Sequence, residues 1–332
     1  MPDRPLTLEA PDVQSQPPPL AVGLSRVGVT GVEKVIRISQ NGSEQLFSAR
    51  LECYVDLGSD QKGAHMSRFE EVVNEAIGEA VLGESTFRAE DLAQRIAELV
   101  RERQRARRAE VRVAARYPEH KPAPVSGINT QEIYTLYGMA LASERGTRRV
   151  VGVAAQGMTA CPCAQELVGA AARARLLEQG FDDSEIERIF DAVPLATHNQ
   201  RGLGTLHVGV TETGTLEIDA RTLLDIVENS MSSEIYELMK RVDEVAVVEK
   251  AHRRPRFVED CVREMINGVL ARLPQLPDEA FVSARQENLE TIHQHNVVAE
   301  RHGLLSELRT ELDSGTPAPH QTSLEEWLTA GV

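Results

Sequence analysis

The first half of the chain alternates between strand-like and helix-like patterns of apolar residues. Four runs are rich in β-branched residues or alternate in polarity, which predicts strands over residues 27–39, 45–57, 108–116 and 132–143. Asn41-Gly42 separates the first two runs and is typical of a tight hairpin turn. Between the second and third runs, apolar residues at helical spacing predict a helix that begins at Ser67, with Glu70 completing a capping box, and another over 89–104.

The second half follows a similar order with longer helical segments, although the two halves share no sequence repeat. Strands are predicted over residues 148–158, 205–212 and 279–286, with a strand-like run around Ile292. Helical patterns cover residues 163–192, 222–239 and 258–273. The first of these contains Ser184 and Glu187, which we interpret as another capping box.

The two ends of the chain differ from the rest. Residues 1–22 hold repeated prolines and few large apolar residues, so we expect a flexible N-terminal tail. The C-terminal tail, residues 303–332, has a helix-like stretch over 304–312, a proline-containing linker and Trp327. Its pattern leaves open whether this tail docks onto the rest of the chain or is disordered.

Composition narrows the class of protein. The 332 residues carry 36 Lys and Arg against 51 Asp and Glu, a formal charge of −15, and the pI is near 5.2. This balance argues against nucleic acid polymers and membranes as partners. No apolar run has the length of a membrane span, and the N-terminus lacks the pattern of a secretory signal. Four cysteines do not make a disulfide scaffold, so we expect a cytoplasmic protein.

Cysteines and histidines mark the first candidate site. In Cys161-Pro-Cys163 the proline favours an extended backbone that projects both thiols to one side. A thiol there is a candidate metal ligand or nucleophile, and the alternative is that the segment is a buried turn. His198 lies in a polar run just before a predicted strand, where a plain solvent-facing side chain is equally expected. His293-Gln-His295 would place two imidazoles on one face, which by itself is a weak metal signal.

Other candidates have an ordinary structural interpretation beside the functional one. Cys53 and Cys261 sit in apolar patterns and are expected to be small core residues. Residues 60–68 join a strand to a helix N-terminus and gather lysine, histidine and arginine, which suits an anion or is a plain polar connection. The carboxylates in 240–244 and 257–260 are ordinary surface groups when taken alone. The sequence has neither a P-loop nor a dinucleotide-binding glycine motif.

Taken together, six segments resemble the GTP cyclohydrolases of type IB, in the order in which that family has them. They are Asp60-Gln-Lys-Gly-Ala-His-Met-Ser-Arg68, Thr159-Ala-Cys-Pro-Cys163, Thr197-His-Asn-Gln-Arg201, Lys240-Arg-Val-Asp-Glu244, Phe257-Val-Glu-Asp260 and Glu290-Thr-Ile-His-Gln-His295. The resemblance covers about residues 24–302. It implies an α+β tunnelling fold of two tandem units, residues 23–146 and 147–302, each with an antiparallel sheet and helices on one face. The second unit would carry a helical insertion at about 164–193.

The resemblance also implies an activity and an assembly. The reaction would be hydrolytic opening of the guanine imidazole ring of GTP, with release of C8 as formate and reclosure to a 7,8-dihydroneopterin phosphate. One divalent metal per subunit, Fe²⁺, Zn²⁺ or Mn²⁺, would activate water near neutral pH. The assembly would be a homotetramer with its active sites at subunit interfaces.

Carried over by motif, each role falls on named residues. The metal ligands would be Cys161, His198, Glu244 and one of the pair His293 and His295, with His293 favoured. The catalytic residues would be Cys161, His295 as general acid or base, and His65. Glu259 would hold guanine through a bidentate carboxylate. The triphosphate would be bound by Lys62, Arg68, Arg201, Lys240 and Arg241.

Two departures bear on the product and the metal. The long segment between Cys163 and His198 is similar to the archaeal branch of the family, which makes a 2′,3′-cyclic phosphate with iron(II) for methanopterin. The folate branch makes the linear triphosphate with zinc or manganese. Val242 also stands where the family usually has proline. The alternative functions are a catalytically silent tunnelling-fold protein that binds a purine or pterin, and a regulatory protein with a structural zinc site.

Overall fold

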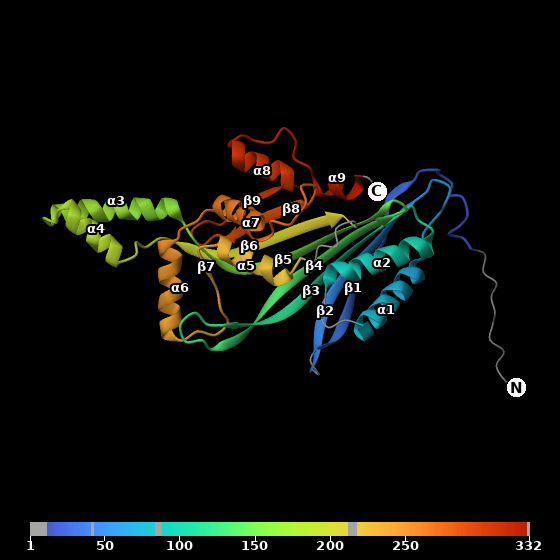
Figure 1. The fold of residues 1–332 in the computed structure, drawn as a ribbon, viewed down its shortest axis with the longest axis horizontal. Coiled ribbons are helices and arrows are strands. Elements are labelled where there is room, and N and C mark those ends of the chain that lie inside the picture. Colours follow the sequence, from blue (N-terminus) through green and yellow to red (C-terminus); the bar gives the residue numbers. More distant parts are fainter. Residues whose placement is uncertain (1–11, 41–42, 84–87, 212–217, 331–332) are drawn as a thin grey trace. The chain divides into compact units, whose positions relative to one another are not determined.

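The computed structural model describes residues 12–40, 43–83, 88–211 and 218–330, and within them it forms one antiparallel sheet with helices (Figure 1). The strands are β1 (Leu24–Gln40), β2 (Ser43–Leu57), β3 (Arg108–Pro122), β4 (Asn129–Ser143), β5 (Gly146–Ala160), β6 (Asn199–Thr211), β7 (Ser233–Glu234), β8 (Phe281–Leu289) and β9 (Val297–Leu304). Their order in the sheet is β1-β2-β3-β4-β5-β6-β8-β9, and β7 pairs with β5. The predicted α+β class is confirmed.

Helices connect these strands in the order that the sequence predicts for the first half. They are α1 (Met66–Gly83), α2 (Ala89–Gln104), α3 (Pro162–Glu178), α4 (Asp183–Ala192), α5 (Ala220–Ser230), α6 (Arg241–Arg253), α7 (Val258–Arg272), α8 (Leu305–Ser314) and α9 (Leu324–Thr329). No helix within the described ranges is both long enough and apolar enough to cross a bilayer.

Contacts divide the chain into two compact units. The described part of the first unit comprises residues 12–113 and 139–149, and that of the second comprises 114–138 and 150–330. Strands β3, β4 and β5 each contribute residues to both units, so this division falls across strands. The tandem boundary at residues 146–147 stays a prediction.

The first unit packs α1 and α2 against the β1–β2 hairpin. The strands pair in register from Ile36↔Phe47 to Gln40↔Ser43, and the predicted turn at 41–42 lies outside the described residues. Phe69 of α1 and Ile96 of α2 are fully buried, as their helical spacing predicts. The core also holds Cys53, whose pKa burial raises to about 12, so its thiol is an inert core group as expected. Helix α1 begins at Met66, so the predicted capping residue Ser67 lies inside the helix instead of preceding it.

Glu90, in the first turn of α2, makes the stability of this unit depend on pH. Burial raises the pKa of this carboxyl from 4.5 to about 7, so the folded protein holds the proton more tightly than the unfolded chain. Stability should therefore fall by about 3 kcal/mol as pH rises from about 4.5 to about 7. Glu90→Gln should remove that loss. Its free energy of unfolding, measured with urea, should exceed that of the wild type much more at pH 8 than at pH 5. Glu102→Gln, at an exposed position of the same helix, is the matched control, and equal gains at both pH values would contradict the prediction.

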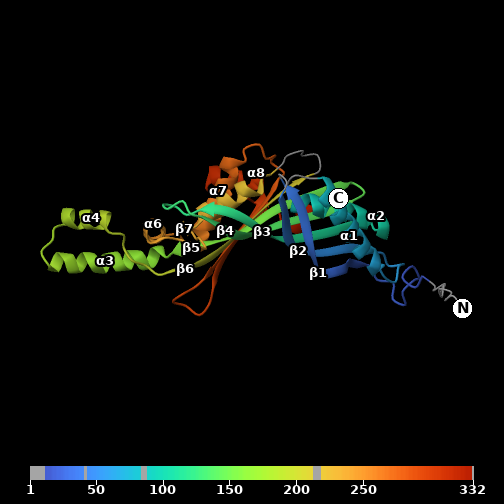
Figure 2. The same cartoon turned by 90° about the horizontal axis from the view of Figure 1, so that it is seen from below.

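The second unit packs α5 and α7 against β6, β8 and β9. Cys261, Met265 and Val269 recur at i, i+4 and i+8 on α7 and are fully buried. Burial raises the pKa of the Cys261 thiol to about 12, which agrees with its predicted place in the core. Outside this core, α3 and α4 lie side by side as a hairpin in both views (Figures 1 and 2).

Several element boundaries in the second unit correct the predictions. The helical run 163–192 is two helices, because Gly180 adopts a left-handed φ of 89° after α3 ends. The capping box of α4 is Asp182 with Glu185, not Ser184 with Glu187. The Asp182 carboxylate accepts the Glu185 N–H at 2.9 Å, and this carboxylate therefore sets the start of α4.

Two further predictions fail where the chain turns. The predicted helix 222–239 stops at Ser230, after which residues 233–234 pair with β5 as β7. No strand lies at Ile292: β8 ends at Leu289, and β9 begins only at Val297. Both errors arise because short apolar runs carry too little periodicity to separate strand, helix and loop.

The described part of the C-terminal tail docks onto the second unit. Trp327 of α9 is 2 % exposed, and its indole N–H donates to the Glu279 carbonyl at 2.9 Å. Its ring lies 5.7 Å from that of Phe281. Gly209 of β6 leaves room for the indole, since a Cβ there would come within 2.6 Å of it. Of the two alternatives that the sequence left open, docking is the one observed.

Candidate functional site

Cys161 and His198 meet where β5 ends and β6 begins. The Cys161 N–H donates to the His198 carbonyl at 3.1 Å, and the Thr197 hydroxyl donates to the Cys161 carbonyl at 2.7 Å. Cys161 is the N-cap of α3, where its sulfur accepts the Ala164 N–H at 3.5 Å and Pro162 occupies the first helical position. Since β5 and β6 are neighbours in the sheet, two motifs 37 residues apart lie side by side. Cys163 is exposed.

A buried amide orients the His198 ring. Its Nδ1 lies 3.0 Å from Oε1 of Gln200, whose own Nε2 donates to the Thr159 hydroxyl at 3.0 Å. Because that amide nitrogen already faces Thr159, its oxygen faces the ring and accepts the Nδ1 proton. The lone pair is then on Nε2, which leaves this nitrogen free to bind a metal, because histidine binds metals through whichever ring nitrogen carries no proton. Gln200 and Thr159 are buried, so the arrangement is shielded from water.

Glu290 lies beside His198, although its place in the sequence by itself indicates no role for it. One carboxylate oxygen lies 3.9 Å from His198 Nδ1, and the side chain is 6 % exposed. That oxygen is buried and has no hydrogen-bond partner among the described residues. A buried carboxylate oxygen without a partner costs stability, so it points to a group that binds there. The signal in the sequence was its position directly after a strand and three residues before His293.

The loop that carries His293 and His295 is tied to the same place. The Thr291 hydroxyl donates to the Asn199 carbonyl at 3.0 Å, next to His198. Both histidines are exposed, and their rings stack with centroids 5.2 Å apart. The two imidazoles therefore lie on one side of the loop, as their spacing predicts, and they remain available to a ligand.

Glu244 starts α6 and does not join Cys161 within one chain. The opposite end of α6 lies near Cys161, because Gln165 of α3 donates to the His252 carbonyl at 2.6 Å. Glu244 lies eight positions before His252 in the helix, or about 12 Å along the axis. Lys240, Arg241 and Glu244 are exposed at the start of α6. Among the residues that the structure describes, no three His, Cys, Asp or Glu side chains converge to hold a metal.

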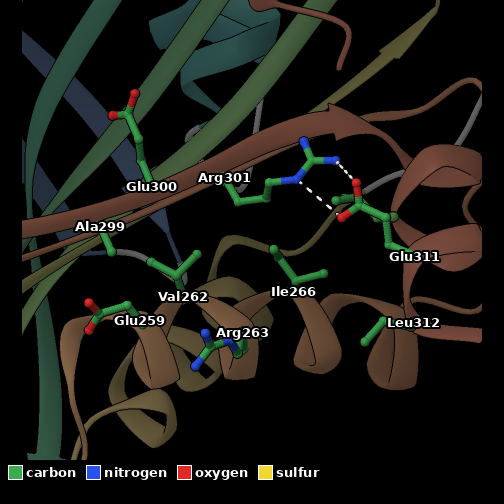
Figure 3. A pocket seen from close by; sticks show the side chains of 10 residues that line it. Glu259, Val262, Arg263, Ile266, Ala299, Glu300, Arg301, Glu311 and Leu312 are labelled. Carbon is green, nitrogen blue, oxygen red and sulfur yellow. Dashed lines mark hydrogen bonds and ion pairs between the residues drawn. The ribbon is translucent and has the colours of Figure 1, made fainter. Parts of the chain in front are cut away.

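Glu259 lies in the first turn of α7, three residues after Arg256, which contacts the residue before Cys161. The Arg256 N–H donates to the Ala160 carbonyl at 2.9 Å. Glu259 is exposed and lines a cleft of about 370 Å³ between α7, β9 and α8 (Figure 3). Arg201, also exposed, donates to Gln156 Oε1 at 2.6 Å on the neighbouring strand β5. Cys161 and His198 do not line this cleft.

Three predicted site residues, Lys62, His65 and Arg68, lie in the first unit. Lys62 is exposed, and its backbone N–H donates to the Gln14 carbonyl at 3.1 Å. His65 pairs through Nε2 with Asp12 at 3.0 Å, and its Nδ1 is buried without a partner in the described chain. Arg68 donates to the Arg103 carbonyl at 3.1 Å. Their roles toward a substrate stay predictions.

Comparison with known proteins identifies the family. Residues 10–299 match the family model of the type I GTP cyclohydrolase folE2. The chain belongs to this family. The relatives include GTP cyclohydrolase MptA 1 of Methanocella arvoryzae, 40% identical over 93% of this chain and 98% of that protein. GTP cyclohydrolase MptA of Methanococcus aeolicus is 41% identical over 91% of this chain and 99% of its own length.

The type I cyclohydrolase chain also shares its fold with solved structures of remote sequence. A hyper-thermostable AgUricase mutant superposes with a TM-score of 0.50 over 85% of this chain and 92% of that chain, at 8% identity. A likeness at such low identity concerns the fold alone. It agrees with the tunnelling fold that the six motifs implied, and the resemblance itself is confirmed by the family match.

The candidate site of this cyclohydrolase chain has donors of the types that bind a divalent metal. Cys161 and His198 offer a thiolate and an imidazole Nε2, both typical ligands of zinc and iron(II). Glu290 places an unsatisfied buried oxygen beside His198. One chain supplies only part of the predicted ligand set, because Glu244 lies at the far end of α6.

Proposed function

We propose that this chain hydrolyses GTP at the guanine imidazole ring and releases formate, and that the product is 7,8-dihydroneopterin 2′,3′-cyclic phosphate. The observation that carries the proposal is the family match over residues 10–299, which includes the adjacent Cys161 and His198. The choice of the cyclic product is supported by the α3–α4 segment between these two residues and by relatives named MptA. Family membership favours the enzyme over the catalytically silent alternative.

The proposed metal ligands are Cys161, His198, Glu244 and His293, with one Fe²⁺, Zn²⁺ or Mn²⁺ per subunit. Such an ion lowers the pKa of a bound water and so supplies a nucleophile near neutral pH. Gln200 would keep the His198 Nε2 directed at the ion, and the exposed His295 would transfer protons at the purine or ribose.

The proposed substrate contacts follow the chemistry of GTP. The Glu259 carboxylate would accept the N1–H and 2-amino groups of guanine. The triphosphate would be bound by the cations Lys62, Arg68, Arg201, Lys240 and Arg241. These local cations allow an anionic substrate despite the overall charge of −15. His65 stays a proposed catalytic residue in the first unit.

A homotetramer with shared sites is supported by the surface of α6. Its buried side is formed by Asp243, Val247 and Ala251. On its other side Val242 and Val245 are 54 % and 61 % exposed, an apolar surface that a second copy would cover. Such a copy would also bring its Glu244 carboxylate to a Cys161–His198 site whose own Glu244 lies at the far end of α6. Mixing inactive Cys161→Ala and Glu244→Ala proteins should then restore part of the activity, whereas an unshared site would stay inactive.

The decisive experiment is turnover of GTP by metal-reconstituted protein. Purified protein loaded with Fe²⁺, Zn²⁺ or Mn²⁺ should release formate from GTP and give a pterin that fluoresces after oxidation. Mass spectrometry should find the cyclic phosphate, and a linear triphosphate would overturn that part of the proposal. Binding of GTP without formate under all three metals would favour the silent alternative. Metal-free protein is the control.

A further inference from the structure

One buried carboxylate, Asp243, fastens the start of α6 to a loop that is distant in sequence. Its Oδ1 accepts the N–H groups of Val125 and Ser126, each at 2.8 Å. Its Oδ2 accepts the Ser126 hydroxyl at 2.7 Å and the Lys240 N–H at 2.8 Å. Asp243 is fully buried. Four donors on one carboxylate make a specific connection, because this buried carboxylate would be left unsatisfied without them.

The loop between β3 and β4 is built to present those donors. The Ala123 N–H donates to the Ile128 carbonyl at 2.9 Å, and the Gly127 N–H donates to the Ala123 carbonyl at 3.1 Å. Gly127 adopts a left-handed φ of 67°, which a residue with a side chain would rarely tolerate. This turn leaves two consecutive N–H groups pointing at α6, and Figure 1 shows the loop at the end where α6 begins.

The start of α6 has few other attachments. Besides Asp243, only Val247 and Ala251 of this helix are buried. The ion pair between Lys250 and Glu234, at 2.6 Å, holds its opposite end. Within α6, the first turn is therefore held through the Asp243 connection, and the Glu237 N–H just before it donates to the Glu132 carboxylate at 2.9 Å. That turn carries the proposed metal ligand Glu244 and the cations Lys240 and Arg241.

We infer that Asp243, together with the Ser126 loop, is a positioning residue that sets Glu244 in place for metal binding. The inference rests on the proposed function, since it takes Glu244 to be a ligand. Asp243 touches neither metal nor substrate: its carboxylate is fully used by the four donors, and it acts through the adjacent residue. Groups that orient a metal ligand raise its affinity for the ion, and removal of such a group typically weakens affinity by about 10- to 100-fold.

Asp243→Asn tests this directly, because the amide nitrogen cannot accept from Ser126 or Lys240. Zn²⁺ affinity, measured by equilibrium dialysis of the full-length protein without GTP, should fall about 10- to 100-fold. Ser126→Ala, which removes one of the four donors, should cause a smaller fall. GTP turnover by Asp243→Asn should recover toward the wild type when the metal is raised to saturation. A purely structural role would lower the melting temperature but leave Zn²⁺ affinity unchanged well below it.

The control is Glu185→Gln, which alters the equivalent capping-box carboxylate of α4, away from the proposed site. It should leave Zn²⁺ affinity unchanged. Wild-type affinity in folded Asp243→Asn, or an equal loss in Glu185→Gln, would overturn the inference. Circular dichroism establishes that each variant is folded, and Ser126→Ala serves if Asp243→Asn does not fold. Failure of the wild type to release formate would instead overturn the proposed function, so the two failures are distinguishable.

Discussion

Cys161→Ala should lower kcat for GTP at neutral pH by at least about a thousandfold, because in the proposed ligand set the metal that activates water would lose its thiolate ligand. The fold should survive, since among the residues that the structure describes the Cys161 sulfur makes one long hydrogen bond, from the Ala164 N–H at 3.5 Å. The measurement is formate release at saturating GTP, together with the metal content of the purified variant. Metal content should fall along with the rate.

The chain offers a matched control two residues away. Cys163 has the same chemistry but is exposed, so Cys163→Ala should keep the wild-type rate and metal content. A normal rate in Cys161→Ala would show that this thiol is not a ligand. If instead Cys163→Ala were the inactive variant, the ligand would be the second cysteine, and the assignment of the motif would be wrong.

Trp327→Ala should lower the free energy of unfolding by about 3–5 kcal/mol, the range for removal of a fully buried aromatic side chain. The indole packs on Phe281, lies against Gly209 and donates a hydrogen bond to the Glu279 carbonyl. Its removal leaves a cavity and an unsatisfied carbonyl at the edge of the second core. Urea unfolding followed by far-UV circular dichroism measures the loss.

Leu312→Ala is the control within the same tail. This side chain is 55 % exposed, so its truncation should change the unfolding free energy by only about 0.5 kcal/mol. Trp327 is the one tryptophan of the chain, so intrinsic fluorescence of the wild type reports docking of α9 directly. Wild-type stability in Trp327→Ala would mean that the tail contributes nothing to the folded state.

Elements with a clear apolar stripe could be predicted, and elements without one could not. Helix α2 buries Leu92, Ile96 and Val100 in regular spacing, and its span is as predicted. Helix α6 was missed because Val242 and Val245 face solvent while Asp243 is buried, which reverses the usual pattern. Such a reversal is itself informative: the exposed valines agree with the proposed contact between copies, and the buried aspartate marks the connection to the 123–128 loop.

The residue types of the site were likewise readable, but its geometry was not. Cys161 and His198 were singled out as candidate chemistry, and the structure places them side by side. Glu290 escaped notice because a single carboxylate after a strand is ordinary in a sequence. Only the folded structure distinguishes Glu290, because its side chain is buried there and one carboxylate oxygen has no hydrogen-bond partner among the described residues. The sequence does not distinguish Gln200 either, because its role depends on the orientation of its amide group.

The sequence by itself determined the family, the class of fold and the order of strands and helices in the first half of the chain, because apolar periodicity and six ordered motifs are local properties of the chain. Only the tertiary structure decided that the C-terminal tail docks, that Asp243 is bound by the 123–128 loop, and that Glu244 stands apart from Cys161 within one chain. These features depend on contacts between residues far apart in sequence, whose hydrogen-bond partners and burial exist only once the chain has folded.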